Sequence, residues 1–378
     1  MSLKLKRFLI LTAIISTVVC TAFISENGKN TSTPTAKTEE NTSDGPKKEK
    51  FSPGDMIMEH VVDAHEWHIT QIGNVHVVVP LPVILYDQGK FVFFMSSKFE
   101  HGHKSYLGYK IEEAKGANNG KIVKVLSDGE TTDKAAKLPF DFSITKTVFA
   151  MLLSLILMCL VFISVARTYK KHPNQPPRGL QGLIEPVILF VRDDIAKPSI
   201  GEERHERFMP FLLMLFFFIL FNNLMGLIPL FPGGANVTGN IAVTMVLAVI
   251  TFIITTFSTN KAYWSHLINM PGVPIWLKLP VPLMPFVEIF GVFIKPVVLM
   301  IRLFANITGG HIIILGFVCL IFIFGEKNIW LDTVVGPFSY AFMVFMNMLE
   351  LLVAFLQAYV FTLLAAIYFG MAKVESHH

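Results

Sequence analysis

The sequence predicts an all-α polytopic membrane protein with a small β-rich extramembrane domain near its N-terminus. Of its 378 residues, 52% are hydrophobic and 16% are charged, whereas roughly 25% are charged in an ordinary soluble domain. Five apolar runs follow residue 140, each close to or longer than the ~20 residues that a membrane helix needs. Before them, short β-type runs alternate with turn residues. The formal net charge of +4 is modest, so we expect no nucleic-acid partner.

The first 22 residues have the order of a secretory signal peptide. Lys4, Lys6 and Arg7 precede an apolar stretch at 8–19, and small residues follow near Ala22. An uncleaved anchor helix is the alternative interpretation. Residues 23–50 are rich in Thr, Ser, Asn, Lys, Glu and Pro. Because such a segment cannot bury enough apolar surface to order itself, we predict a disordered linker.

Residues 51–140 are predicted to form the small β-rich domain. Gly, Asp and Asn turn signals separate short runs of β-branched and aromatic residues. Its function is not indicated by any motif that we find in it. The runs are Val75–Val79, Val83–Tyr86, Phe91–Phe94 and Lys121–Leu126.

Histidines and cysteines suggest no metal centre. A zinc site at His65 and His68 is conceivable, but their spacing matches no zinc motif, so we expect ordinary surface histidines. The cysteines lie in apolar segments, which predicts buried free thiols rather than a disulfide framework. The histidines of this domain are His60, His65, His68, His76, His101 and His103, and the cysteines are Cys20, Cys159 and Cys319.

Residues 141–374 are predicted to form the membrane domain. The last two apolar runs exceed one perpendicular crossing, because at ~1.5 Å per residue they outreach a ~30 Å hydrocarbon core. Each should therefore be bent, strongly tilted or broken, and Pro280, Pro282 and Pro285 mark a break at the start of the first. The expected helices lie near 144–166, 208–230, 241–257, 281–325 and 336–372.

The loops predict the orientation. Segment 167–208 is rich in Lys and Arg, 231–240 has neither, and 259–280 carries Lys261 and Lys278. By the positive-inside bias, the first and third of these loops face the cytoplasm. The β-rich domain would then be extracytoplasmic and the C-terminus cytoplasmic. Residues 180–191 look amphipathic and are expected to lie along the membrane surface.

Polar side chains gather in the last two apolar runs. Glu288, Lys295 and Arg302 are seven residues apart, and each step turns a helix by only about −20°. They therefore share one face, ~10.5 Å apart, which is too far for direct ion pairs without side-chain reach. In the last run, Glu350 and Gln357 also share a face.

Arg302 is the most informative of these residues. Its guanidinium stays charged at every physiological pH, and holding that charge in hydrocarbon costs roughly 3–17 kcal/mol. His311 lies nine residues later, half a turn away on a straight helix, and histidine is a side chain that proteins use to handle protons. If His311 pairs with Glu350, Arg302 has no obvious partner in its own chain. We hypothesise that a carboxylate on another membrane protein faces it.

These residues resemble a known family, subunit a of the F-type ATP synthase. The resemblance covers about residues 141–374, and the sequence looks bacterial. The segments around Arg302 and Gln357 are the most specific. The similar segments are Glu288, Lys295-Pro296, Arg302-Leu-Phe-Ala-Asn306-Ile-Thr-Gly-Gly-His311, Leu356–Phe361, Phe221–Pro229 and the span from Asn240.

The resemblance implies that Arg302 is the stator arginine, which faces the carboxylate of a rotating c-ring between two aqueous half-channels. Glu288 would lie on the cytoplasmic half-channel, and Lys295 would be an accessory residue. The two long runs would be tilted helices that curve along the ring. The outer half-channel would be lined by Glu350, His311, Asn306 and Gln357.

The resemblance also implies partners: a c-ring proteolipid with a membrane carboxylate, the peripheral stalk subunit b, the rest of the ATP synthase and the lipid of a cell inner membrane. It implies neither a cofactor nor an ATP site on this chain. Many bacterial members carry Glu where this chain has His311 and His where it has Glu350. Both positions remain titratable here, so we expect the proton path to be kept. Segment 25–140 is not explained by the family.

Two other functions are considered. A secondary transporter for an anionic substrate would use Arg302 to bind that anion, but it predicts an inverted internal repeat and we find none that is convincing. An intramembrane enzyme could use His311 and Glu350 as general base and partner. It would also need a nucleophile or a metal-ligand cluster, and the sequence supplies neither.

Overall fold

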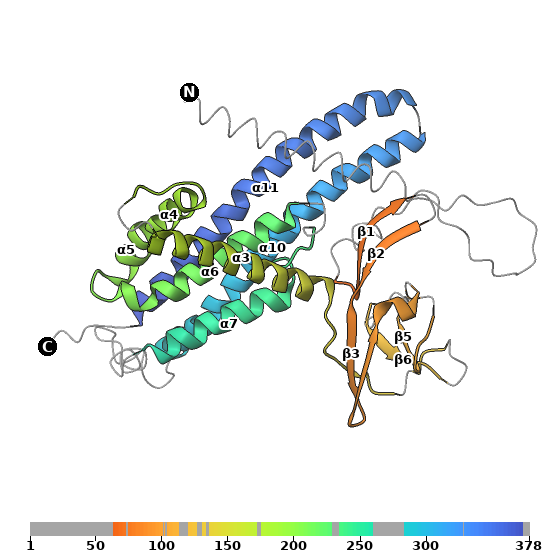
Figure 1. The fold of residues 1–378 in the computed structure, drawn as a ribbon, viewed down its shortest axis with the longest axis horizontal. Coiled ribbons are helices and arrows are strands. Elements are labelled where there is room, and N and C mark those ends of the chain that lie inside the picture. The colour runs from red at the N-terminus through yellow and green to blue at the C-terminus, as the bar shows by residue number, and fades with distance from the viewer. Residues whose placement is uncertain are drawn as a thin grey trace, which may run out of the picture. The chain divides into compact units, whose positions relative to one another are not determined.

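The computed structural model shows a mostly helical chain with a small β-containing N-terminal region (Figure 1). This confirms the predicted mainly helical chain with a small β-containing region, whereas five membrane crossings and the tilt of the long helices stay predictions. The signal peptide and linker expected at 1–50 lie outside the described residues, as do His60, His101 and His103. The described residues are 63–72, 75–100, 102, 104–112, 120–126, 131–133, 136–171, 175–228, 234–259, 283–327 and 329–372.

The strands of the N-terminal region form three small antiparallel sheets. One holds β1 and β2, the second has the order β4-β3-β7, and the third holds β5 and β6. A short 3₁₀ helix, η1, follows β4. The bounds are β1 Glu66–Ile72, β2 Val75–Pro80, β3 Pro82–Asp87, β4 Lys90–Met95, η1 Ser96–Phe99, β5 Tyr109–Ile111, β6 Ile122–Lys124 and β7 Phe140–Asp141.

The β3–β4 hairpin is the centre of this region. Gln88 and Gly89 at its turn both have positive φ, 46° and 82°, as two-residue hairpin turns require. The register pairs Asp87 with Lys90 at the turn, and alternate residues therefore point to the same face. One face is buried in a core formed by Val83, Leu85, Phe94, Phe99, Tyr109 and Ile122.

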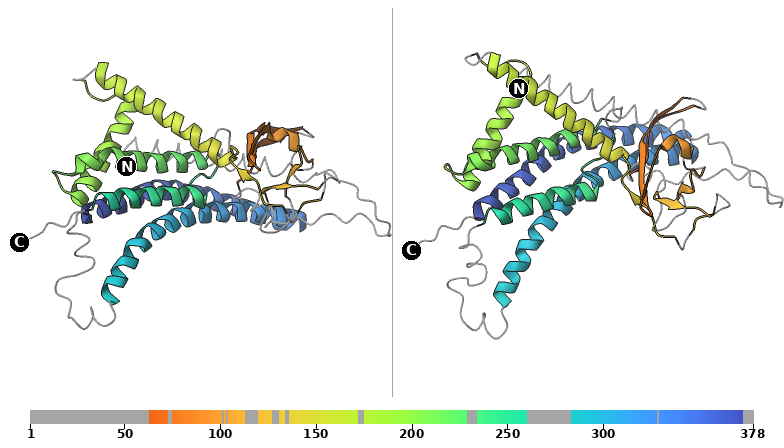
Figure 2. Two further views of the ribbon diagram at one scale, coloured as in Figure 1. Left: turned by 90° about the horizontal axis from the view of Figure 1, so that it is seen from below. Right: turned by 60° about the horizontal axis from the view of Figure 1, so that its bottom comes forward.

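Within the described residues, four helices are long and apolar enough to cross a membrane, and α7 is a shorter apolar helix. A π-helical stretch, η2, joins α4 to α5. Their arrangement can be followed in Figures 1 and 2. The bounds are α3 Lys146–Lys171, α4 Leu180–Phe190, η2 Val191–Ala196, α5 Lys197–Ile200, α6 His205–Gly226, α7 Ile241–Phe257, α10 Leu283–Lys327 and α11 Ile329–Met371.

The two long apolar runs are unbroken helices. The first, α10, begins at Leu283, so Pro285 lies in its first turn, where a missing N–H is tolerated. It also continues through Pro296, and Figure 2 shows the cyan first half of α10 as curved. The length of this run predicted a helix that is bent, strongly tilted or broken, and the first half of α10 is bent.

The chain divides into two compact units. The first comprises 1–152, 226–235 and 311–348, and the second comprises 153–225, 236–310 and 349–378. Each long helix contributes one half to each unit. In the second unit, aromatic rings stack between α6 and α11, where the centroids of Phe208 and Phe369 are 4.7 Å apart.

The cysteines agree only in part with the expectation of buried thiols. Among the described residues neither Cys159 nor Cys319 forms a disulfide; Cys319 is buried, whereas Cys159 is exposed on α3. Because α3 is a membrane-span candidate, an exposed apolar position on it is a position that lipid can cover. Cys20 lies outside the described residues.

Candidate functional site in the membrane helices

Arg302 lies on an exposed, otherwise apolar face of α10. Val298, one turn earlier, and Ile301 beside it are exposed, while Leu299 and Leu303 on either side of Arg302 are buried. Asn306, one turn later, is exposed as well. Among the described residues, the structure gives Arg302 no ion pair. The guanidinium is therefore open to an anionic group on another molecule.

Glu350 and Gln357 occupy the buried side of α11, with 5% and 3% of their surface exposed. Their seven-residue spacing places them on this one face. Oε1 of Glu350 lies against Gly310 of α10, so close that a methyl group on the Gly310 α-carbon would come within 3.0 Å of it. The glycine thus makes room for a buried carboxyl group at the contact between α10 and α11.

A buried polar network adjoins this face of α11. The side-chain amide of Asn223 donates to the carbonyl of Ala354, one turn after Glu350, at 3.2 Å. The hydroxyl of Thr238 donates to Oδ1 of Asn223 at 2.5 Å. Next to it, the hydroxyl of Ser154 donates to Oδ1 of Asn222 at 2.8 Å.

Sequence reasoning did not include these network residues among the site residues. The available signal was the adjacent pair Asn222–Asn223 within an otherwise apolar run. Amides inside a membrane helix are expensive unless another element supplies their hydrogen-bond partner. A pair of them therefore indicates a buried polar contact between helices.

Lys295 lines a pocket between α7, the first half of α10 and the end of α11. Its ammonium group lies 5.5 Å from the ring centroid of Tyr368, a cation–π arrangement. Threonine hydroxyls of α7 face the same pocket and donate within their own helix, as Thr255 does to the carbonyl of Thr251 at 2.7 Å. The lining residues are Ala248, Thr251, Phe252, Thr255, Thr256, Thr259, Val292, Lys295, Pro296, Leu299, Tyr368 and Met371.

The remaining two predicted site residues lie at other places on α10. His311 is half-buried and belongs to the first unit. Glu288 lies in the second turn of α10, and its side chain is outside the described set. The predicted residues within the second unit are Glu288, Lys295, Arg302, Asn306, Glu350 and Gln357.

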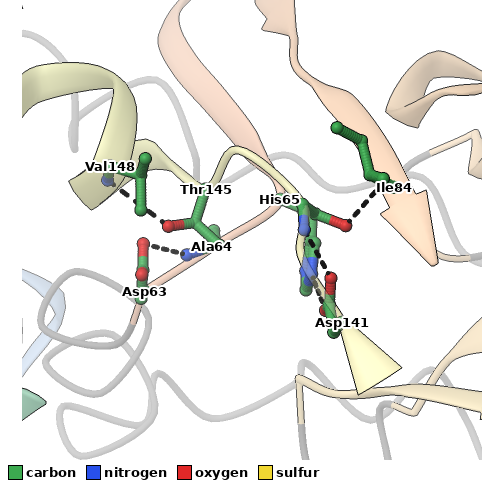
Figure 3. Close-up of polar contacts among 8 residues, drawn as sticks. Asp63, Ala64, His65, Ile84, Asp141, Thr145 and Val148 are labelled. Carbon is green, nitrogen blue, oxygen red and sulfur yellow. Dashed lines mark hydrogen bonds and ion pairs between the residues drawn. The ribbon is translucent and has the colours of Figure 1, made fainter. Parts of the chain in front are cut away.

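A second polar cluster joins the N-terminal region to the start of α3 (Figure 3). His65 is 8% exposed, and its Nε2 lies 2.8 Å from Oδ2 of Asp141. The expectation of an ordinary surface histidine is therefore wrong for His65. Oδ1 of Asp63 accepts a hydrogen bond from the backbone N–H of Thr147 at 3.0 Å. The carbonyl of Ala64 accepts one from the backbone N–H of Lys146 at 2.8 Å. These acceptors satisfy N–H groups that the first turn of a helix leaves unpaired.

Electrostatics stabilise the ionised form of Asp141. Burial raises the pKa of this carboxyl, but hydrogen bonds with His65 and Ser143 outweigh burial, and the pKa lies below its ordinary value. Among the described residues, no group of three or more His, Cys, Asp or Glu side chains could hold a metal ion. The cluster thus acts as a structural connection between β1, β7 and α3.

Comparisons with known proteins bear on both regions. Residues 148–370 match the family described as "ATP synthase A chain", and residues 56–142 match one described as "Domain of unknown function (DUF8433)". The chain is 44% identical over 245 residues to ATP synthase subunit a of Chloroherpeton thalassium, which covers 63% of this chain and 69% of that protein. It is 43% identical over 245 residues to ATP synthase subunit a of Myxococcus xanthus, which covers 63% and 75%.

Proposed function

Because this chain belongs to the ATP synthase A chain family, we propose that Arg302 is the fixed charge past which protons are carried by a rotating partner. The chain is the stator subunit a of a bacterial F-type ATP synthase, a multi-pass membrane protein that works within that complex. The partner facing Arg302 would be a c-ring proteolipid with a membrane carboxylate. The peripheral stalk subunit b would hold the chain against it.

One observation carries this proposal: the permanent charge of Arg302 on an exposed apolar face. A permanently charged side chain on an exposed face, with no ion pair among the described residues, favours an anion supplied by another subunit. A ring carboxylate can meet that need only in its deprotonated form. Protons must then ride the ring between two access paths, because the arginine cannot pass them on.

Access from the outer side would run along the buried face of α11. Glu350 and Gln357 lie there, next to the Asn223–Ala354 hydrogen bond. His311 and Asn306 of α10 would complete this path. A carboxyl group that is buried beside amides and hydroxyls offers successive donors and acceptors, which is what a proton relay needs.

Access from the cytoplasmic side would use the Lys295 pocket. Its threonine hydroxyls keep free lone pairs for water while donating to their own helix. Glu288, two helical turns before Lys295, would lie at the same end. In this orientation the membrane domain has five crossings, the N-terminal domain is extracytoplasmic and the C-terminus is cytoplasmic.

The energetic basis is the membrane potential. Each elementary charge that crosses gains about 2.3 kcal/mol per 100 mV. A direct leak past Arg302 would waste that energy, because no rotation would accompany it. The fixed charge therefore couples proton flow to rotation.

The test replaces Arg302 and measures proton pumping driven by ATP in inverted membrane vesicles. We expect Arg302→Ala to abolish pumping while the chain stays inserted and assembled, as quantified by immunoblotting of purified complex. Ile301→Ala, which alters the neighbouring exposed position, is the matched control and should pump normally. Normal pumping by Arg302→Ala would reject the proposal.

A further inference from the structure

The β4-β3-β7 sheet has one face that the described residues leave uncovered. Phe91 and Phe93 of β4 are 73% and 67% exposed, and Phe140 of β7 and Phe142 just after it are 69% and 62% exposed. The register places them together: Phe91 and Phe140 both pair with Tyr86 of β3. This surface, called here the phenylalanine face, comprises Ile84, Tyr86, Phe91, Phe93, Met95, Phe140 and Phe142.

The phenylalanine face is tied closely to the start of a membrane-span candidate. Phe142 precedes Lys146, the first residue of α3, by four residues, so at ~3.3 Å per extended residue it lies within roughly 13 Å of it along the chain. The edge of Trp67 in β1 packs against the ring of Phe149 in α3, with centroids 5.7 Å apart. Together with the His65–Asp141 contact (Figure 3), this fixes the sheet against the first turn of α3.

The elements that cover the opposite face of the sheet show which way the phenylalanine face points. The opposite face of β3 and β4 is buried against Tyr109 of β5 and Ile122 of β6. In Figure 1 the β5–β6 hairpin lies on the side of β3 that is away from the first turn of α3. The phenylalanine face therefore points back to the side from which α3 enters the lipid.

The size and chemistry of the face favour lipid over a second protein. At about 200 Å² for a phenylalanine side chain, rings exposed by 62–73% present roughly 500 Å² in all. A stable protein interface buries about 800 Å² on each partner, so this face is small for a dimer. None of its residues is charged, as the headgroup–acyl boundary of a bilayer requires, and aromatic rings favour that boundary.

We propose that the phenylalanine face rests on the surface of the membrane that α3 enters, with its rings inserted at the headgroup–acyl boundary. The N-terminal domain then has a fixed orientation on the membrane surface at the start of α3, and it does not move independently of the membrane. This inference does not depend on the roles proposed for Arg302 and the other membrane residues. It rests on the exposed rings, their register and the fixed junction with α3.

The experiment measures where the face lies by electron paramagnetic resonance of a spin label. The three native cysteines are replaced by Ser, and a nitroxide is attached at Phe93→Cys or at Phe140→Cys in the assembled complex, reconstituted in liposomes. Lys121→Cys is the matched control, because this exposed residue lies in the β5–β6 hairpin on the other side of the sheet. Relaxation by oxygen, which concentrates in lipid, is compared with relaxation by a water-soluble nickel chelate.

We expect the label at positions 93 and 140 to be reached several-fold better by oxygen than by nickel, and the label at 121 to show the reverse. Strong relaxation by nickel at 93 would mean that the face stands in water and would overturn the proposal. Protection from both reagents would mean that protein covers the face, either residues 1–62 or another subunit, and would overturn it equally. Because the substituted positions are exposed, the variants should fold.

Discussion

At the scale of single residues, the contact between Gly310 and Glu350 determines how a carboxyl group is held inside the membrane domain. Gly310 is one of two adjacent glycines in α10, but only it lies against another helix. Gly309 has open space where a side chain would project. A change to Ala improves helix propensity by about 1 kcal/mol at either position. Only at Gly310 does it also crowd a neighbouring side chain, so comparing the two variants isolates the steric effect.

We predict that Gly310→Ala impairs proton pumping and Gly309→Ala does not. The added methyl group would come within 3.0 Å of Oε1 of Glu350, so the carboxyl group must shift by a few tenths of an ångström or more. Misplacing a reacting group by about 1 Å can cost up to ~100-fold in rate. Pumping in inverted vesicles, normalised to the amount of assembled complex, measures the effect, and equal rates for the two variants would contradict it.

At the scale of elements, the start of α3 is stabilised by Asp63 and Ala64, which precede β1, together with Thr145 just ahead of the helix. Because the pKa of Asp141 is lowered in the folded chain, its ionised form contributes stability above the unfolded pKa of about 3.9. That contribution is lost as the pH falls through the lowered folded pKa. The pH window for any effect is therefore acidic, below about pH 4.

We predict that Asp141→Asn lowers the unfolding temperature of the N-terminal domain at neutral pH, corresponding to roughly 1–3 kcal/mol for hydrogen bonds to a charged group. The difference from the unmodified chain should shrink progressively as the pH falls below about 4, because the carboxyl group then becomes protonated and loses its charge. Fluorescence of buried Trp67 in lipid nanodiscs reports the transition. Asp194→Asn, at an exposed carboxyl of η2, is the control. A difference that persisted undiminished at low pH would show that charge is not the cause.

At the scale of the whole molecule, a chain whose fixed charge needs an external anion should be isolated together with the protein that carries it. We predict that purification in mild detergent recovers a small oligomeric proteolipid with a membrane carboxylate. Mass spectrometry of the intact assembly identifies it, and the same purification with the tag on an unrelated membrane protein is the control. Recovery of the chain alone would count strongly against the rotary interpretation.

The features that follow from local composition could be predicted from the sequence. Long apolar runs become helices because a lipid core leaves no other partner for backbone groups, and the spacing of Glu350 and Gln357 fixes their shared face. Contacts between distant segments could not be predicted in this way. His65 looked like a surface residue because its partner, Asp141, is 76 positions away. The short strands β5 and β7 likewise exist only through their pairing with other strands.

The junction at α3 has a consequence for the ancestry of this chain. The carbonyl of Ala64 accepts a hydrogen bond from the N–H of Lys146 at 2.8 Å. The two ends of the segment between these residues therefore lie next to each other. A module with adjoining ends can be gained, exchanged or excised without altering the path of the helix that comes after it. Relatives with a different N-terminal module could thus keep the same first helix, and a protein engineer could insert another domain at this position.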